Sequence, residues 1–331
     1  MIARKISICR SFSFGSLSLE FIIRSAQQSY KLKLYHQPII ILASIVAIFY
    51  ALHKLGETLM IGSETRLVAI IGSPIAQVKS PDNFNRYFAD HATDRAMIAV
   101  DLLPGSVADF VSTARGWRNL DGFVVTIPHK TAVAELVDDL SDTARFLGAA
   151  NVVRRHSDGR LSGDMTDGTG FVSASQLHGF TPAGKAVLLV GAGAAGSAIA
   201  YSLAAAGVAS LRLSDHKDDR AQSLATRLAK VFPSVDITSG PIPIRSFNLV
   251  VNASSSGMQA NDPLPIPEAV LNAMSGRGLL ADVVTSPTIT PLLALAVARG
   301  LTIQTGEEMA KAQLFTLGSA MGIMGGGRSN D

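Results

Sequence analysis

From residue 66 onward the chain alternates short apolar runs with stretches of helical periodicity. The apolar runs predict strands at 66–71, 96–102, 122–127, 150–154, 186–190, 210–214, 248–252 and 279–284. Helices are predicted between the first four strands, at 82–92, 105–115 and 129–147. Strands and helices that alternate in this way predict an α/β fold, with helices covering the faces of mostly parallel sheets.

The same pattern divides the chain into three parts. Residues 1–59 precede the first predicted strand, residues 60–164 form a first three-layer α/β domain, and residues 165–304 form a second α/β domain. A last helical pattern predicts a C-terminal helix within residues 305–324. We expect this helix to pack back on the first domain.

The N-terminal segment, residues 1–59, contains one long apolar run, at 39–52, which only Ser44 interrupts. The run is shorter than the roughly 18 residues expected of a membrane-spanning helix, and no signal-peptide cleavage pattern follows it. We interpret Met60 as the natural first residue, so that the preceding segment results from a misplaced start codon. A weak membrane anchor and an amphipathic or disordered arm are the alternatives.

Charge is distributed unevenly along the chain. Residues 1–59 hold 7 Lys and Arg against 2 Asp and Glu, whereas the whole chain has 29 against 26. The net charge of +3 therefore comes from the N-terminal segment and does not predict a nucleic-acid partner. The only cysteine, Cys9, lies in the same segment, and the histidines lack the spacing of a metal site. We expect a cytoplasmic protein without disulfides or bound metal.

The strongest local signal is a glycine-rich turn directly after the apolar run at 186–190. The turn has the GxGxxG spacing of a dinucleotide-binding loop, with Gly191, Gly193, Ala194, Ala195 and Gly196. The first glycine permits a tight turn, the second lets the backbone approach a pyrophosphate, and the third lets the next helix pack on the strand. These five residues therefore predict a Rossmann domain that binds NAD or NADP.

The end of the next predicted strand bears on the choice of dinucleotide. Asp215 stands close to the position where a carboxylate receives the ribose hydroxyls of NAD. Because a carboxylate repels the 2′-phosphate of NADP, the sequence favours NAD. Lys217 and Arg220 are cations a few residues further on, and they keep NADP as the alternative.

Two ionisable residues stand where predicted strands give way to helices. Lys130 follows the strand at 122–127, and Asp167 begins a helical segment that ends at Leu177. Hydride transfer between a nicotinamide and a carbinol carbon needs a proton carrier, so we predict that Lys130 and Asp167 are the catalytic pair. The alternative is a surface salt bridge. We expect His129 to face solvent at the start of a helix.

The order of these motifs resembles the shikimate dehydrogenase family across residues 66–323. The matching strings are Gly72–Pro81, Val125–Lys130, Gly148–Asn151, Thr166–Gly168, Gly191–Gly196, Asn252–Met258 and Gly306–Gln313. The resemblance implies an N-terminal substrate domain and a C-terminal Rossmann domain that enclose a cleft. There, 3-dehydroshikimate and shikimate would be interconverted by hydride transfer, a step of aromatic amino acid biosynthesis.

The resemblance also implies roles for further residues. Substrate oxygens would be held by Ser80, Thr126, Asn151 and Gln313, and the cofactor by Asn252, Met258 and Gly306 in addition to the glycine loop and Asp215. The implied partner is a small cyclic hydroxy acid, without nucleic acid and without a membrane unless residues 39–52 are an anchor. We expect a monomer or a homodimer.

The chain departs from the family pattern at several substrate positions. Val78 replaces one of two family serines, Val124 and Met165 replace asparagines, and Thr285 replaces a tyrosine. A single lost hydrogen bond to a charged group costs about 1.5–3 kcal/mol. Quinate or another cyclic hydroxy acid is therefore the alternative substrate, and Lys79 is either a substitute carboxylate contact or a solvated lysine. A nucleotide-binding protein without dehydrogenase activity is the alternative of another class.

Overall fold

The computed structural model describes residues 61–76, 78–259, 261–274 and 278–324. The interpretations of residues 1–59, and of the apolar run at 39–52 in particular, fall outside these ranges. Among the residues that the structure describes, no helix is both long enough and apolar enough to cross a membrane.

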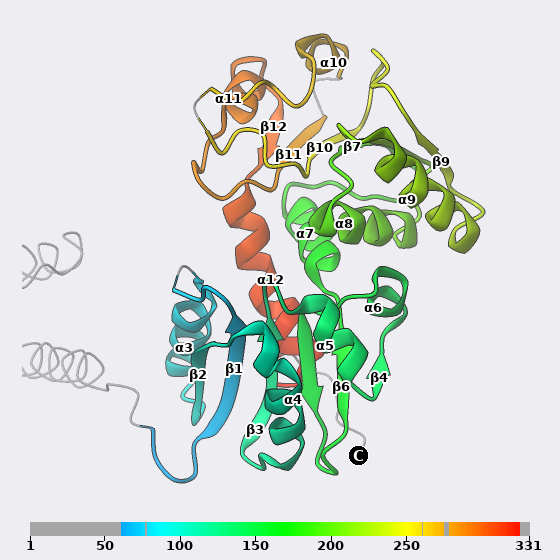
Figure 1. Ribbon diagram of the computed structural model, residues 1–331. Helices are drawn as coiled ribbons and strands as arrows, with labels where there is room; N and C mark the ends of the chain where they lie inside the picture. Colours follow the sequence, from blue (N-terminus) through cyan, green and yellow to red (C-terminus); the bar gives the residue numbers. More distant parts are fainter. Residues whose placement is uncertain (1–60, 77, 260, 275–277, 325–331) are drawn as a thin grey trace, which may run out of the picture. The chain divides into compact units, whose positions relative to one another are not determined.

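The first half of the described chain forms a mixed sheet of six strands in the order β2-β1-β3-β5-β6-β4 (Figure 1). The strands are β1 (Arg66–Gly72), β2 (Arg95–Asp101), β3 (Leu120–Val125), β4 (Asp139–Leu140), β5 (Val152–Arg155) and β6 (Leu161–Asp164). Strand β1 pairs in parallel with β2 and β3, and β5 joins β3 antiparallel. β1 and β3 are buried at nearly every position, as strands covered on both faces must be.

Helices cover both faces of this sheet. On one face α3 (Ser80–Asp90) and the C-terminal helix α12 (Gly306–Ala320) bury an apolar cluster that includes Phe84, Phe88 and Leu317. On the other face α4 (Val107–Gly116) and α5 (Lys130–Leu136) bury a second cluster around Phe123. The result is the three-layer α/β arrangement predicted for this part of the chain.

The second half forms a fully parallel sheet of six strands in the order β12-β11-β10-β7-β8-β9. The strands are β7 (Ala186–Val190), β8 (Ser210–Ser214), β9 (Asp236–Ser239), β10 (Leu249–Asn252), β11 (Leu279–Asp282) and β12 (Thr302–Gln304). The chain starts at β7, proceeds outward to β9, and returns to the other side of β7 with β10. Ligands of doubly wound sheets bind at this reversal, beyond the carboxyl ends of the strands.

Helices also cover both faces of the second sheet. One face packs against α7 (Asp167–Leu177), α8 (Ala194–Ala205) and α9 (Asp218–Val231). The other packs against α10 (Glu268–Ala273) and α11 (Pro291–Ala298). The two apolar clusters meet the sheet from opposite sides, which is why its strands are almost continuously apolar.

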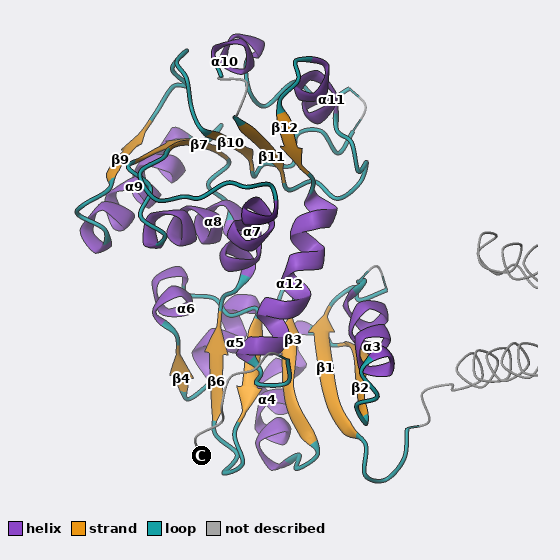
Figure 2. Ribbon diagram, turned by 180° about the vertical axis from the view of Figure 1, so that it is seen from behind, coloured by secondary structure: helices purple, strands orange, loops and turns teal. Residues whose placement is uncertain are grey.

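Two helices run between the sheets. α7 follows β6 directly and packs on α8, while α12 begins beside β11 and contacts α3 and β5 (Figure 2). α7 and α12 also pack closely on each other. Residues on these two helices are therefore placed with respect to both sheets.

The helix predicted at 129–147 is wrong. This stretch contains α5 and a second helix, α6 (Asp142–Leu147), with the short strand β4 between them. The chain leaves the helical path because the Asp138 carboxylate accepts the backbone N–H of Leu161 at 2.7 Å, and because Ser141 caps the start of α6. A local hydrophobic pattern does not report a bond to a residue so far along the chain.

Candidate active site

Four polar side chains meet at the start of α7. Nζ of Lys130 donates to Oδ2 of Asp167 at 2.7 Å. Nδ2 of Asn151 and Nε2 of Gln313 donate to Oδ1 of the same carboxylate, at 2.6 and 3.2 Å. The two residues predicted as a catalytic pair are thus in direct contact, with two of the predicted substrate residues beside them.

These side chains come from separate segments of the chain. Asp167 is the first residue of α7, Lys130 the first of α5, Asn151 precedes β5, and Gln313 lies within α12. Gln313 reaches the carboxylate because α7 has a glycine where the two helices touch. A Cβ at Gly170 would lie 2.7 Å from Cγ of Gln313.

The geometry around Asp167 suits an acceptor that orients an ammonium group. The side chains of Lys130 and Asp167 are 23% and 14% exposed, so the pair is partly shielded but still reachable by a ligand. A carboxylate at the first turn of a helix also lies at the positive end of the helix dipole. Lys130 has three N–H donors and uses one on Asp167, which leaves donors for a substrate oxygen.

Asn151 has its amide engaged inside the protein. The residue is 3% exposed, and besides its bond to Asp167 its Nδ2 lies 3.3 Å from Oγ1 of Thr166. Its Oδ1 accepts the backbone N–H of Thr166 at 2.9 Å. In this structure Asn151 fixes the turn that carries Asp167, and its contact with a substrate oxygen stays a prediction.

The remaining predicted substrate residues, Ser80 and Thr126, lie at turns of the first sheet. Ser80 begins α3, and Thr126 directly follows β3. Both are half-buried. A Cβ at Gly72 would lie 2.4 Å from Cγ2 of Thr126, so the turns after β1 and β3 are in close contact. Their roles toward substrate stay predictions.

The expectation that His129 faces solvent is wrong. The residue is 1% exposed, and its Nε2 lies 2.7 Å from the carbonyl oxygen of Leu102. The ring ties the start of α5, and hence the backbone of Lys130, to the chain that follows β2. Nothing in the local sequence around His129 indicates a partner that far away.

The turn after β7 has the conformation that a dinucleotide loop requires. Gly191 has φ 103°, and a Cβ at Gly196 would lie 1.9 Å from the carbonyl oxygen of Gly191. A Cβ at Gly193 would meet nothing within 4 Å, so the backbone there is open to approach. The N–H groups of Ala194 and Ala195 belong to the first turn of α8, where helical hydrogen bonds do not use them. This is the cradle that a pyrophosphate fits.

Asp215 holds this turn in place. Its side chain is 3% exposed, and its Oδ2 and Oδ1 accept the backbone N–H groups of Ala192 and Lys217 at 2.7 and 2.9 Å. Burial acts to raise the pKa of Asp215, but these two bonds, together with electrostatic attraction to His216 and Arg220, hold the pKa below its ordinary value. Little of the carboxylate is left open, so the preference for NAD over NADP stays a prediction.

The other predicted cofactor residues differ in exposure. Asn252 is fully buried at the end of β10, whereas Met258 is 54% exposed. Gly306 begins α12, and a Cβ there would lie 2.4 Å from the carbonyl oxygen of Val284. Asn252 and Gly306 therefore position the backbone around them, and the contacts of Asn252, Met258 and Gly306 with a cofactor stay predictions.

Comparison with known proteins identifies the family. A family model described as the shikimate dehydrogenase substrate binding domain matches residues 70–153. The shikimate dehydrogenase (NADP(+)) of Rubrobacter xylanophilus is 37% identical over 257 residues, which cover 75% of this chain and 88% of that protein. The chain belongs to the shikimate dehydrogenase family.

Solved structures of similar fold agree. Shikimate 5-dehydrogenase from Listeria monocytogenes, in complex with shikimate and NAD, matches with a TM-score of 0.71 at 29% identity, over 80% of this chain and 92% of that one. The 5-ketofructose reductase of Gluconobacter sp. strain CHM43 matches with a TM-score of 0.72 at 28% identity, over 78% and 93%. The predicted fold class and an NAD- or NADP-dependent dehydrogenase are thereby confirmed.

This member of the shikimate dehydrogenase family has apolar side chains at three of the four positions where its sequence departs from the family pattern. Val124 and Met165 are 5% and 3% exposed and belong to apolar clusters. Val78 is half-buried against the cluster that contains Phe84, and Thr285 is exposed. The missing hydroxyl and amide groups are therefore replaced by packing contacts at three of the four positions.

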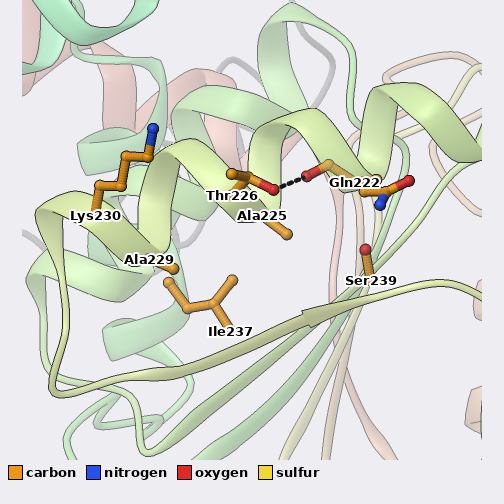
Figure 3. A pocket seen from close by; sticks show the side chains of 7 residues that line it. All are labelled: Gln222, Ala225, Thr226, Ala229, Lys230, Ile237 and Ser239. Atoms are coloured by element: carbon orange, nitrogen blue, oxygen red, sulfur yellow. Dashed lines mark hydrogen bonds between the residues drawn. The ribbon is translucent and has the colours of Figure 1, made fainter.

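A hollow on the surface lies away from these residues. It lies between α9 and β9, has a volume of about 510 Å³, and is lined by Gln222, Ala225, Thr226, Ala229, Lys230, Ile237 and Ser239 (Figure 3). Among its polar groups, the Thr226 hydroxyl already donates to the carbonyl oxygen of Gln222 at 2.9 Å. The chemistry described above lies elsewhere, at Lys130 and Asp167.

Proposed function

We propose that this member of the shikimate dehydrogenase family interconverts 3-dehydroshikimate and shikimate with NAD or NADP. The observation that carries the proposal is the contact of Lys130 Nζ with Asp167 Oδ2 at 2.7 Å, in a chain that also has a dinucleotide turn at Gly191–Gly196. Because the reaction draws on the NAD(P) pool, we place the protein in the cytoplasm. We further propose that it works as a monomer or homodimer, which light scattering of the purified chain would test.

In the direction of ketone reduction, Lys130 donates a proton from Nζ to the substrate oxygen as that oxygen gains electrons. Asp167 accepts another N–H of the same ammonium and fixes its direction, and Asn151 and Gln313 hold the carboxylate through Oδ1. The reduced cofactor, NAD(P)H, would supply the hydride for the carbonyl carbon when bound, and would leave as NAD(P)⁺. In alcohol oxidation, the neutral amine of Lys130 receives the hydroxyl proton. General acid catalysis of this kind contributes about 10²–10⁴-fold to the rate.

The domain plan that supports this mechanism places substrate contacts in residues 60–164 and in α12, and nucleotide contacts in residues 165–304. The substrate contacts in this proposal are Ser80, Thr126, Asn151 and Gln313. Ser80 and Thr126 lie at turns beyond the strand ends of the first sheet, the side on which Lys130 begins α5. Substitution of each of these four residues should raise the KM for the acid more than the KM for the nucleotide.

The experiment that tests the function measures reduced nicotinamide formed by the full chain from shikimate or quinate, with NAD and with NADP. Lys130→Ala should lower kcat by about 10²–10⁴-fold. Lys230→Ala removes an exposed lysine on α9 and serves as the matched control. Turnover of shikimate that Lys130→Ala loses and Lys230→Ala keeps would support the proposal. Equal turnover in both variants would remove Lys130 from the mechanism.

A second candidate, a dehydrogenase for quinate or another cyclic hydroxy acid, is favoured by one observation. Val78 packs its side chain into the apolar cluster of the first sheet, where a serine would offer a hydroxyl to the substrate carboxylate. One lost bond to a charged group costs about 1.5–3 kcal/mol, or roughly 10-fold to 100-fold in affinity. A kcat/KM for quinate above that for shikimate would establish this candidate, and Val78→Ser should then shift the ratio toward shikimate.

A further inference from the structure

A buried polar network lies at the carboxyl ends of β10 and β11, the two strands that follow one another on one side of β7. Asn252, the last residue of β10, pairs in register with Val190 of β7 on one side and with Asp282 of β11 on the other. Asn252 is 0% exposed and Asp282 is 2% exposed. Asn252 therefore stands beside the turn that begins at Gly191, at the edge of the sheet where a dinucleotide binds, and Asp282 stands one strand further from that turn.

The amide of Asn252 makes all the hydrogen bonds that an amide side chain offers. Nδ2 donates to Oδ1 of Asp282 and to the carbonyl oxygen of Ser256, both at 3.0 Å. Oδ1 accepts the N–H and the hydroxyl of Ser254 at 3.1 and 2.6 Å. The orientation of the amide is fixed, because the carboxylate needs a donor and the Ser254 N–H needs an acceptor.

Asp282 is the other end of this network. Its Oδ1 also accepts the N–H of Val284 at 3.0 Å, and its Oδ2 accepts the hydroxyl of Thr290 at 2.7 Å. Burial raises the pKa of Asp282, although these bonds and the one from Asn252 oppose the rise. A buried carboxyl is costly, so its presence beside a ligand site calls for a function.

The loop that the network holds, residues 253–257, touches the glycine turn directly. A Cβ at Gly191 would lie 2.7 Å from the backbone of Ala253 and Ser254, and a Cβ at Gly196 would lie 3.3 Å from Cβ of Ala253. A shift of the loop toward the turn would therefore displace the turn, and a shift away would remove the backbone that supports it. The network thus transmits the position of Asp282 to the residues that bind the pyrophosphate.

We propose that Asp282 is a positioning residue for the dinucleotide: through Asn252 it holds the 253–257 loop against the Gly191–Gly196 turn and thereby sets the affinity for NAD(P). The proposal rests on the proposed function for the identity of the ligand. It assigns Asp282 no contact with the substrate and no proton transfer.

The test measures the Kd of NADP⁺ and of NAD⁺ for the full chain by calorimetry, without acid substrate. Asp282→Ala should raise the Kd of the preferred nucleotide about tenfold or more, since it leaves Asn252 and Val284 without their acceptor. Asp282→Asn should stay within about threefold of wild type, because the new amide keeps an oxygen for those donors and its NH₂ is able to donate to Thr290. Asp236→Ala, an exposed acid on the edge strand β9, is the control.

Ser254→Ala keeps the test decisive if Asp282→Ala does not fold. It removes the 2.6 Å hydroxyl bond to Asn252 and the acceptor of the Ser256 N–H at 3.2 Å, both within the 253–257 loop, and should raise the same Kd several-fold. The Kd of the double variant should not exceed the higher of the two Kd values of the single variants, because both substitutions act through one loop. Wild-type Kd values in folded Asp282→Ala or in Ser254→Ala, or effects that multiply in the double variant, would overturn the proposal.

Steady-state kinetics give a second readout. The variants should raise the KM of the nucleotide and leave the KM of shikimate nearly unchanged. A rise in the KM of shikimate alone would overturn the proposal. If the chain proves inactive on shikimate and quinate, the proposed function fails, but the calorimetric result still decides the role of Asp282.

Discussion

Replacement of Gly170 by alanine tests whether the contact between α7 and α12 sets the geometry at Asp167. A Cβ at this position would lie 2.7 Å from Cγ of Gln313, 3.4 Å from its Cα and 3.5 Å from its backbone nitrogen. The first of these distances is shorter than carbon atoms tolerate, and Cγ is near the root of the side chain. Gln313 must therefore change rotamer, or α12 must move away from α7. Either adjustment withdraws Nε2 from Oδ1 of Asp167.

The magnitude follows from two opposed effects on stability. Overpacking of a tight contact costs about 1–3 kcal/mol, whereas glycine to alanine within a helix gains about 1 kcal/mol. The net loss is about 0–2 kcal/mol, which corresponds to a fall in Tm of up to roughly 8 °C for a protein of this size. The lost bond from Gln313 to a charged acceptor is worth about 1.5–3 kcal/mol, so we expect kcat/KM to fall about 10-fold to 100-fold.

Two further glycines calibrate the measurement. Gly116, on α4, has nothing within 4 Å of its added Cβ, so Gly116→Ala should keep its activity and be neutral or slightly stabilised. A Cβ at Gly168 would lie 2.0 Å from the carbonyl oxygen of Ala198, a backbone atom that cannot rotate away, so Gly168→Ala should be the least stable of the three. Thermal denaturation ranks the three variants by stability, and dehydrogenase kinetics rank them by activity. If Gly170→Ala has the same Tm and the same kcat/KM as Gly116→Ala, the contact between α7 and α12 does not set the geometry at Asp167.

Three other predictions concern charge and capping. Asp215→Asn keeps an oxygen for the N–H of Ala192 and removes a negative charge. The ratio of kcat/KM for NADP to kcat/KM for NAD should therefore rise about tenfold. An unchanged ratio would show that this carboxylate does not select the cofactor. The pKa of Asp282 is raised in the folded state, so its ionisation destabilises the fold as pH rises through that pKa. Denaturant titrations should therefore show that Asp282→Asn gains stability relative to wild type from acidic to neutral pH. Thr305→Ala removes the capping box at the start of α12 and should cost about 1 kcal/mol in denaturant unfolding, with no loss if the cap contributes nothing.

The elements and residues that follow from local pattern were predictable from the sequence. Lys130 and Asp167 could be paired in advance because each stands where a strand passes into a helix, and such junctions gather at one edge of a sheet. The glycine turn after β7 could be located for the same reason. Contacts between distant residues could not be predicted. His129 is buried because its ring bonds the carbonyl oxygen of Leu102, and the amide of Asn252 is fixed because it bonds Asp282 on the adjacent strand.

The strands likewise divide into those that local pattern predicts and those that long-range pairing places. Strands that are buried on both faces, such as β1 and β7, have continuous apolar runs and were predicted within a residue or two of their bounds. The edge strands β9 and β12 and the hairpin partner β6 are short and carry polar residues, so their sequences do not differ from those of loops. β4 interrupts the helix predicted at 129–147 because its pairing with β6 is decided by the sheet and not by its own two residues.

The glycines along α7 and α12 indicate what the acid–base pair depends on. Gly168, Gly170 and Gly306 would each place a Cβ within 2.7 Å of a neighbouring element, and none of the three has the positive φ that only glycine adopts readily. They are therefore small to permit close approach, not to permit an unusual turn. Since α12 starts against the chain after β11 and brings Gln313 to Asp167, the carboxylate is oriented by contacts with both sheets. Small-to-large changes on these helices should thus disturb the reaction more than changes of equal size at exposed positions nearer to Lys130.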